Sequence, residues 1–200
     1  KEGVTETDLA EQLKKIYRDL GADGLSFEPL FAFGSNAASG HHWPDDTRLK
    51  PGDCILVDIG CTWEGYCSDM TRTFFYKNVT QHQQEVYHTV LKANEEAEKA
   101  VTPGIPLSSL DQIARGIITD KGYGSAFTHR LGHFIGLEDH EFGDVSSASA
   151  DRAVPGNIFS IEPGVYLEND MGVRVEDLVL VTDHGHEILN HFSKELTVID

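Results

Sequence analysis

Carboxylates on apolar, β-branched stretches are the residues of this sequence that most clearly suggest chemistry. Four of them lie in or next to runs that are typical of buried strands: Asp58, Asp69, Glu162 and Glu176. A buried carboxylate is costly unless it binds a metal ion, shares a proton or meets an arginine. The four positions therefore indicate either a metal site or a set of buried ion pairs.

The spacing of these carboxylates predicts two face-to-face pairs. If a four-residue turn covers residues 62–65, Asp58 lies opposite Asp69, with the Cβ atoms about 5 Å apart. A second hairpin, with an odd-numbered loop centred in the polar stretch 168–170, places Glu162 opposite Glu176. Like charges directly opposite each other destabilise a hairpin, so a neutralising partner is expected in both halves.

Two arginines, Arg72 and Arg174, are candidates for that partner, but two cations do not balance four anions. Two divalent ions bridged by a hydroxide nearly do. The sequence therefore predicts a two-metal site, with structural ion pairs as the alternative. Mostly oxygen ligands with a single histidine suit manganese, cobalt or iron better than a thiolate-type zinc site.

Histidines supply the remaining candidate groups, and three of the ten fall within residues 129–140. The His-x-x-x-His spacing found here lacks the glutamate of the zincin motif, and Gly132 and Gly136 argue against a helix. A histidine alone is a weak signal. The histidines gain significance only in combination with the four acids: His41, His129, His133 and His140.

Helix and strand patterns predict how these groups are positioned. Apolar residues at helical spacing predict helices over 5–20, 80–101 and 108–121. Capping pairs are expected at their starts: Thr5 with Asp8, Thr80 with Gln83, and Ser108 with Asp111. Strands are predicted over 27–33, 54–59, 70–76, 158–161, 165–167 and 173–182. Without regular βαβ alternation, this order favours one α+β domain over residues 1–200.

A weak internal repeat links the two predicted hairpins. Pro51-Gly52 and Pro155-Gly156 each precede an apolar strand, and each has a carboxylate seven residues after its proline. The interpretation is two similar halves, each built round one hairpin. Coincidence is the alternative, because Pro-Gly before a strand is common.

Composition limits the classes of function. The chain has 33 acidic and 16 basic residues and a formal net charge of −17, which disfavours binding to nucleic acid and to anionic membranes. No apolar stretch approaches the roughly 20 residues of a membrane span. Three cysteines without a Cys-x-x-Cys pair are typical of reduced thiols, so a cytoplasmic location is expected.

Several segments, in order, resemble the "pita-bread" metallopeptidases, which include Xaa-Pro aminopeptidases, prolidases (Xaa-Pro dipeptidases) and methionine aminopeptidases. The resemblance covers essentially the whole chain, and two segments, Asn36-Ala37-Ala38 with His41 and Thr71-Arg72-Thr73-Phe74, are closer to the proline-specific branch. The other segments are Val57-Asp58-Ile59-Gly60, Gly65-Tyr66 to Asp69-Met70, His129 to His133, His140-Glu141, Ser160-Ile161-Glu162-Pro163-Gly164 and Gly172-Val173-Arg174-Val175-Glu176-Asp177.

The resemblance implies an α+β pita-bread fold with two similar halves, a ligand-bearing antiparallel hairpin in each, and helices packed outside. It implies that two metal ions are held by Asp58, Asp69, His133, Glu162 and Glu176, with Asp69 and Glu176 bridging. A bridging hydroxide would be the nucleophile and Glu162 the proton shuttle. The remaining implied roles are substrate or oxyanion binding (His129 and His140), the proline-side pocket (His41) and orientation of carboxylates (Arg174).

The expected activity is hydrolysis of an N-terminal Xaa-Pro bond in a dipeptide or short peptide, with two divalent ions, manganese first and cobalt, zinc or iron as alternatives. Methionine aminopeptidase, another amidohydrolase or a non-catalytic peptide-binding module are the alternative functions. Gly40-His41-His42 departs from the family's Pro-His-Tyr, so the pocket wall is expected to differ. The family's N-terminal domain and leading helix are expected to be absent from these residues, and the full-length protein to be a homodimer.

Overall fold

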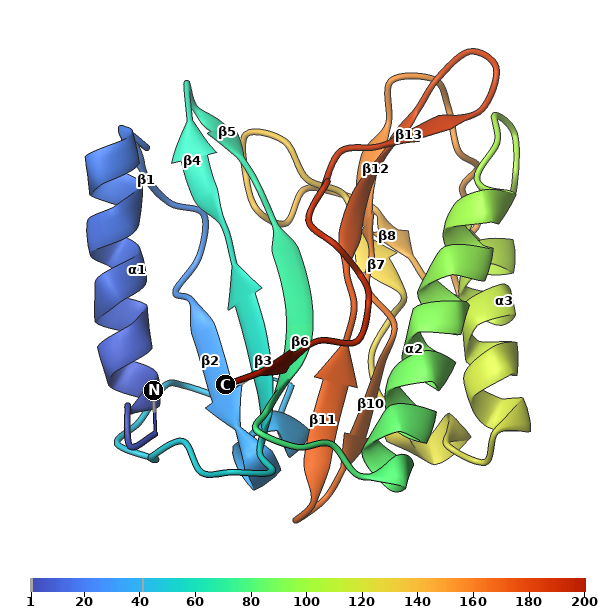
Figure 1. The fold of residues 1–200 in the computed structure, drawn as a ribbon. Helices are drawn as coiled ribbons and strands as arrows, with labels where there is room; N and C mark the ends of the chain where they lie inside the picture. Colours follow the sequence, from blue (N-terminus) through green and yellow to red (C-terminus); the bar gives the residue numbers. More distant parts are fainter. Residues whose placement is uncertain (1, 41) are drawn as a thin grey trace.

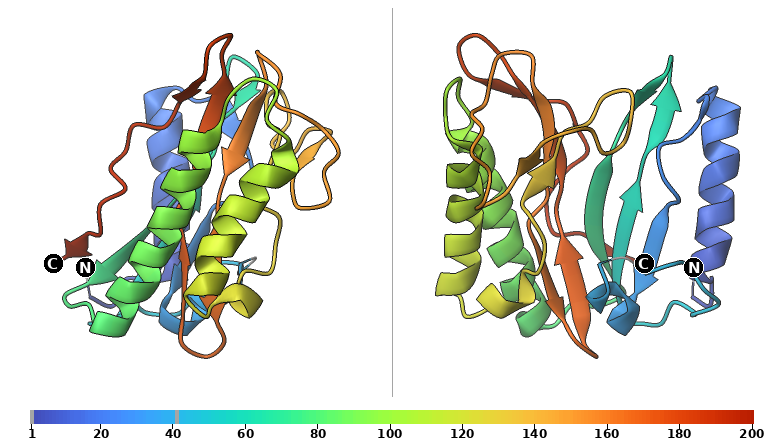
Figure 2. Two further views of the ribbon diagram at one scale, coloured as in Figure 1. Left: turned by 90° about the vertical axis from the view of Figure 1, so that its right-hand side faces the viewer. Right: turned by 180° about the vertical axis from the view of Figure 1, so that it is seen from behind.

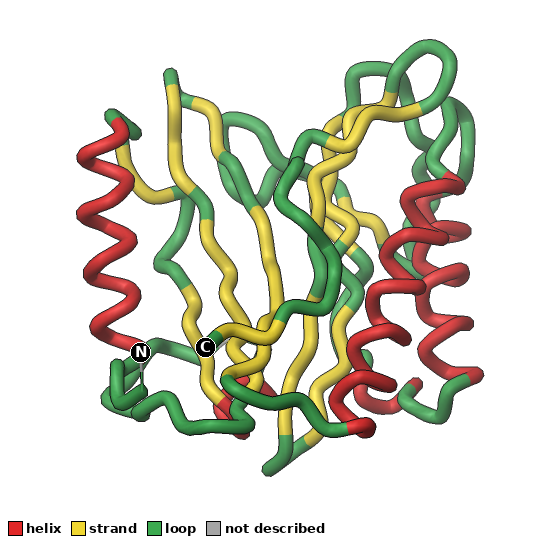
Figure 3. Tube along the Cα trace, viewed as in Figure 1, coloured by secondary structure: helices red, strands yellow, loops and turns green. Residues whose placement is uncertain are grey.

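The computed structural model describes residues 2–40 and 42–200. Its α-helices are α1 (Glu6–Leu20), α2 (Gln81–Ala100) and α3 (Leu107–Asp120), and short 3-10 helices cover Gly34–Ala38 and Gly124–Ala126. Its strands are β1 (Gly24–Leu25), β2 (Leu30–Phe33), β3 (Cys54–Ile59), β4 (Cys61–Trp63), β5 (Tyr66–Cys67), β6 (Met70–Tyr76), β7 (Gly132–His133), β8 (Asp144–Val145), β9 (Ile158–Ile161), β10 (Gly164–Leu167), β11 (Met171–Arg174), β12 (Asp177–Val181), β13 (His186–Ile188) and β14 (Val198–Ile199). Figure 3 shows the strands in the middle of the molecule and the three α-helices at its two sides.

The elements stack as layers, with sheets inside and helices outside. Figure 1 shows α1 on one side of the β2–β3–β6 sheet and α2 and α3 on the far side of the strands β9 to β12. The rotated views in Figure 2 show the same order. This arrangement confirms the predicted α+β class.

The sheet of the first half has the order β14-β6-β3-β2. Its central pair, β3 and β6, is antiparallel, with Asp58 opposite Thr71 and Ile59 opposite Met70. The prediction that Asp58 faces Asp69 is therefore wrong. Asp69 lies immediately before β6, two residues along the chain from the position opposite Asp58.

The turn of this hairpin explains the error. Trp63 pairs with Tyr66, so the turn contains two residues and not the four expected over 62–65. Both turn residues, Glu64 and Gly65, have positive φ angles of 50° and 82°, as two-residue hairpin turns of the mirror-image type require. Because the register differs by an even number of residues, Asp58 and Asp69 still project from the same face of the sheet.

The register of the second hairpin is the predicted one. Strands β10 and β11 pair Gly164 with Arg174, and the loop between them is centred on Asn169, whose φ is 59°. Strands β9 and β12 continue in the same register, which places Glu162 and Glu176 opposite each other at the break between the two strand pairs.

The two Pro-Gly turns have the same backbone geometry. Gly52 and Gly156 have φ angles of 92° and 93°, in the left-handed region that favours glycine. Each donates its N–H over 2.8 Å to the last residue of the returning strand, Gly52 to Tyr76 O and Gly156 to Val181 O. The repeat seen in the sequence is therefore a repeat of structure.

Helix boundaries follow the predicted caps in two cases of three. Thr5 caps α1 with Asp8, and Thr80 caps α2 with Gln83 in complete capping boxes. The predicted cap of α3 is wrong, because α3 begins at Leu107 after Pro106 and has no side-chain cap. Ser108 and Asp111 lie inside that helix; the Asp111 carboxylate is buried and accepts hydrogen bonds from Arg115 and from Leu131 N.

Three clusters of buried apolar residues hold the layers together. The largest lies between α2, α3 and strands of both halves, and the two smaller ones lie on the α1 side of the first sheet, one with Phe33 and Ile55 and one with Leu13 and Phe31. The strand predicted over 27–33 is β2, which is shorter than expected and begins at Leu30. None of the described helices is long and apolar enough to cross a membrane. Cys54, Cys61 and Cys67 are free thiols.

Candidate metal centre

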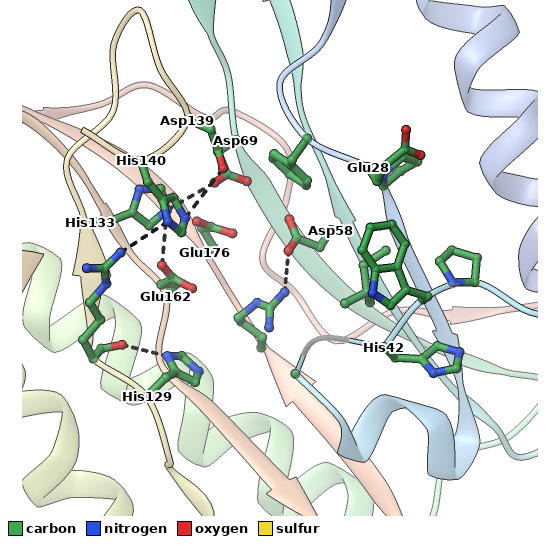
Figure 4. A pocket seen from close by; sticks show the side chains of 18 of the residues that line it. Glu28, His42, Asp58, Asp69, His129, His133, Asp139, His140, Glu162 and Glu176 are labelled. Atoms are coloured by element: carbon green, nitrogen blue, oxygen red, sulfur yellow. Dashed lines mark hydrogen bonds and ion pairs between the residues drawn. The ribbon is translucent and has the colours of Figure 1, made fainter. Parts of the chain in front are cut away.

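A pocket of about 560 Å³ lies where the two halves meet. Figure 4 shows acidic and histidine side chains gathered along one side of it. On that side are Asp58, Asp69, His129, His133, Asp139, His140, Glu162 and Glu176, and Glu28 and His42 line the opposite side. The structure thus brings together all five residues expected to hold metal, which come from the two hairpins and from β7.

Breaks in the second-half strands aim two of the carboxylates into the pocket. Glu162 follows β9, and its N–H bonds to Leu131 O beside β7 over 2.8 Å. Glu176 precedes β12, and its N–H bonds to Thr71 O of β6 over 3.1 Å. Each break lets the chain change hydrogen-bond partners, and the Glu176 contact joins the two halves.

His133 on β7 has its ring oriented for coordination. Its Nδ1 lies 3.1 Å from Phe134 O, and since a carbonyl only accepts, Nδ1 must carry the proton. Its Nε2 faces Asp69 Oδ2 and Glu162 Oε1, each at 3.5 Å. A ring whose Nδ1–H is held by a backbone carbonyl and whose Nε2 faces carboxylates is arranged as a metal ligand.

The donor set fits a divalent cation. Ligand atoms of Asp69, His133 and Glu176 lie within 4.8 Å of one another, and all three residues are buried. Asp58 Oδ1, Asp69 Oδ1 and Glu176 Oε1 are buried without a hydrogen-bond partner among the described residues. Ionised carboxylates left in this way favour a cation, because desolvation otherwise costs several kcal/mol for each charge, to order of magnitude.

The pKa values of the clustered carboxyl groups also indicate that they lack a neutralising partner. Burial, followed by the negative charge of Glu176, raises the pKa of Asp69 well above its ordinary value. Burial, followed by the charge of Glu162, does the same to the pKa of Glu176. Burial raises the pKa of Glu162 to about 7, against the opposing effect of Arg174. The protein alone therefore does not stabilise the ionised cluster.

Arg174 connects the cluster to its surroundings. Its guanidinium donates to Asp58 Oδ2 at 2.5 Å, to Thr71 Oγ1 at 2.9 Å and to the Tyr166 hydroxyl at 2.8 Å. Thr71 in turn donates to Glu176 Oε2 at 2.6 Å. One buried arginine thus orients carboxylates of both halves, and it balances only one of the four negative charges.

Three further histidines were predicted to take part in the site. His129 Nδ1 lies 2.7 Å from Arg130 O and Nε2 lies 2.9 Å from the Tyr166 hydroxyl. The exposed ring of His140 lies against that of His133, with 3.9 Å between ring centroids and the planes tilted by 44°. His41 lies outside the described residues.

Some pocket residues were missed by reasoning from sequence. Asp139 lines the pocket, its buried Oδ1 has no hydrogen-bond partner among the residues that the structure describes, and burial raises the pKa of its carboxyl group. Its position beside His140 was the one available signal. Tyr166 and Thr71 carry no such signal, because a hydroxyl on an apolar strand is common and its partners lie far away in the sequence.

Comparison with known proteins decides the family. The sequence model that describes metallopeptidase family M24 matches residues 1–183 of this chain. The chain belongs to metallopeptidase family M24. The name of the family describes metal-dependent peptidases. In this M24 chain, the side chains of the types that bind metal ions cluster in the acidic pocket.

Solved structures agree closely with this M24 chain. An X-Pro aminopeptidase from Thermotoga maritima matches with a TM-score of 0.97 and 37% identity, over 100% of this chain and 56% of that one. An Xaa-Pro dipeptidase from Bacillus anthracis matches with a TM-score of 0.97 and 34% identity, over 100% and 56%. An uncharacterized peptidase of Staphylococcus aureus is 45% identical over 194 residues, 97% of this chain and 55% of the relative. The M24 chain thus spans about half the length of the relatives it matches.

Proposed function

We propose that this chain is the catalytic part of a two-metal exopeptidase that hydrolyses the bond between an N-terminal residue and a following proline. The observation that carries the proposal is the convergence of Asp69, His133 and Glu176, together with carboxylate oxygens that have no other partner among the described residues. Similarity to relatives described as an X-Pro aminopeptidase and an Xaa-Pro dipeptidase supports the substrate class.

Five side chains would hold the ions. The full set is Asp58, Asp69, His133, Glu162 and Glu176. When bound, the ions supply Lewis acidity, which makes a water molecule nucleophilic near neutral pH and polarises the scissile carbonyl. The oxygen-rich set leads us to expect manganese, with cobalt, iron or zinc as alternatives.

We assign proton transfer to Glu162. Its pKa is raised to about 7, and the Ser160 hydroxyl holds its Oε1 at 3.0 Å. With ions bound, its carboxylate would be ionised and could take a proton from the attacking water. It can then pass that proton to the proline nitrogen, which leaves as the amine when the C–N bond breaks.

The two histidines flanking His133 are assigned to the substrate. Both ring nitrogens of His129 have protein partners, so His129 reaches a substrate only by exchanging its Tyr166 contact. His140 is more exposed and stands above the metal ligands, so it is the better placed to stabilise the developing oxyanion.

Substrate chemistry follows from the pocket walls. Opposite the acidic cluster lies a mostly apolar wall, which suits the ring of proline: Phe27, Pro29, Leu30, Trp43 and Pro44, with Glu28 and His42 beside them. The acidic groups favour a cationic N-terminus. An Xaa-Pro bond has no N–H to donate, so a site that grips the free amine and the carbonyl does not need that hydrogen bond.

The deciding experiment is product analysis by mass spectrometry with Ala-Pro and Ala-Pro-Ala, using manganese and a chelator control. Metal-dependent release of alanine from either peptide is the expected result. Cleavage of the dipeptide alone indicates a dipeptidase, and cleavage of the tripeptide with little on the dipeptide indicates an aminopeptidase. Metal binding without cleavage of either peptide would overturn the proposed substrate class.

A further inference from the structure

Outside the metal ligands, Glu6 is the most heavily hydrogen-bonded carboxylate in the described part of this fold. It lies in the first turn of α1 and has no exposed surface. Its Oε1 accepts from Phe33 N at 2.7 Å and from Asn36 Nδ2 at 3.0 Å. Its Oε2 accepts from His42 Nε2 at 2.6 Å and from Asp45 N at 3.1 Å.

Glu6, His42 and Asp45 have the residue types of a cation site, but their hydrogen bonds argue against one. Both oxygens of Glu6 already accept two N–H groups each, which satisfies the carboxylate. Asp45 Oδ1 accepts from Thr47 N at 2.6 Å. The cluster is therefore a set of hydrogen bonds that ties chain segments together.

The segments tied by Glu6 are those that build the apolar wall of the pocket. Phe33 is the last residue of β2, whose first residue, Leu30, belongs to the wall and follows the wall residue Pro29. His42 and Asp45 flank Trp43 and Pro44, the other wall residues. Figure 4 shows the His42 ring turned away from Asp58 and the other carboxylates. One buried carboxylate thus connects both parts of the wall to α1.

We propose that Glu6 and His42 form a positioning pair that fixes the apolar wall and thereby sets affinity for the residue on the carboxyl side of the scissile bond. This inference rests on the proposed function. Glu6 does not line the pocket, whereas His42 does, and its Nε2 is directed at Glu6. The pair therefore acts through Trp43 and Pro44.

The pair has a specific kinetic signature. The wall contacts the substrate in the ground state and the transition state alike, so loosening it raises KM and leaves kcat nearly unchanged. Metal affinity is also unchanged, because neither residue touches Asp69, His133 or Glu176. A loss of general stability would lower kcat, metal content and substrate affinity together.

Matched variants of Glu6 and His42 test whether KM changes while kcat and metal affinity stay the same. His42→Phe keeps the ring and removes the donor, and His42→Gln keeps a donor of similar reach. Glu6→Gln keeps the shape, but its NH2 group now faces two N–H donors, whichever way the amide is turned. His82→Phe is the control, because His82 forms an exposed pair with Asp170 on another face, at 3.3 Å.

With Ala-Pro and manganese, His42→Phe is expected to raise KM about tenfold, the effect of losing one hydrogen bond to a charged group. kcat should stay within about twofold on the same reasoning, with metal affinity by calorimetry unchanged. His42→Gln and His82→Phe should resemble the wild type. An unchanged KM in His42→Phe, or an equal loss of kcat and metal affinity, would overturn the proposal.

A second readout needs no catalysis. The chain has two tryptophans, so Trp63→Phe leaves Trp43 as the sole reporter of the wall. In that background, His42→Phe and Glu6→Gln should change acrylamide quenching of Trp43, whereas His42→Gln should not. If the wild type cleaves no Xaa-Pro peptide, the proposed function fails, while unchanged quenching rejects the positioning pair by itself.

Discussion

At the scale of single residues, the metal centre depends on groups that the fold makes costly to ionise. Asp69 shows this most directly, because burial and the neighbouring Glu176 raise its pKa in the protein without metal. Such a residue contributes to function at the expense of stability. Replacing it should separate the two properties.

We expect Asp69→Asn to fold and to lose metal-dependent hydrolysis. The neutral amide removes a buried charge, so the melting temperature of the chelator-treated variant should equal or exceed that of the wild type. Peptidase activity, metal content by mass spectrometry and calorimetry provide the measurements. Asp170→Asn, at an exposed loop position, is the matched control. Retained activity in Asp69→Asn would contradict the ligand assignment.

Tyr166 tests the connection between Arg174 and His129. Its hydroxyl accepts from Arg174 and contacts His129 Nε2, and its ring is held in the core. Tyr166→Phe keeps the ring, so we expect kcat to fall about tenfold, as expected for the loss of hydrogen bonds to a charged group. Metal content should stay the same. An unchanged kcat would show that His129 does not need this contact.

At the scale of elements, the β11 strand approaches the 3-10 helix at Gly34–Ala38 too closely for a side chain. A Cβ at Gly172 would lie 1.7 Å from Ala37 O, a backbone atom. The glycine is therefore required by packing between the halves. It also brings Arg174, two residues later, to the pocket.

Gly172→Ala is expected to unfold the protein or to lower its stability by several kcal/mol, about the upper range for single substitutions. Gly116→Ala is the matched control, since Gly116 lies in α3 and a Cβ added there would meet nothing within 4 Å among the described residues. That change should stabilise by about 0.5–1 kcal/mol. Urea denaturation measures both, and equal effects would contradict the packing argument.

At the scale of the whole molecule, the raised acidities make stability depend on pH and metal together. Burial raises the pKa of Glu98, beside Lys194, to about 7, and the pKa of Glu162 reaches about 7 as well. Between the unfolded and folded pKa values, the folded state binds more protons. Its stability therefore falls as the pH rises through that interval.

Chelator-treated protein should accordingly melt at a higher temperature near pH 5.5 than near pH 8. Saturating manganese should remove or reverse this difference, because metal binding requires ionised carboxylates and so strengthens as the pH rises. Differential scanning calorimetry at both pH values, with chelator and with manganese, measures the effect. Greater stability of the metal-free protein at the higher pH would contradict the raised pKa values.

The distance along the chain between interacting residues explains which predictions were confirmed. Helices α1 and α2 begin at their predicted caps, and the second hairpin has its predicted register around Asn169, because these features depend on residues close together in the sequence. The cap of α3 failed because the Asp111 carboxylate is recruited by Arg115 and Leu131 instead of by its own helix end.

The sequence by itself determined the α+β class, the family and the identity of the clustered acids and His133, because residue type and local spacing carry that information. Only the tertiary structure decided that Asp58 faces Thr71, and that Thr71 meets Glu176 across 105 residues of chain. It also decided that Glu6 holds His42. These contacts depend on how distant segments of the chain pack together. Local spacing in the sequence does not encode that packing.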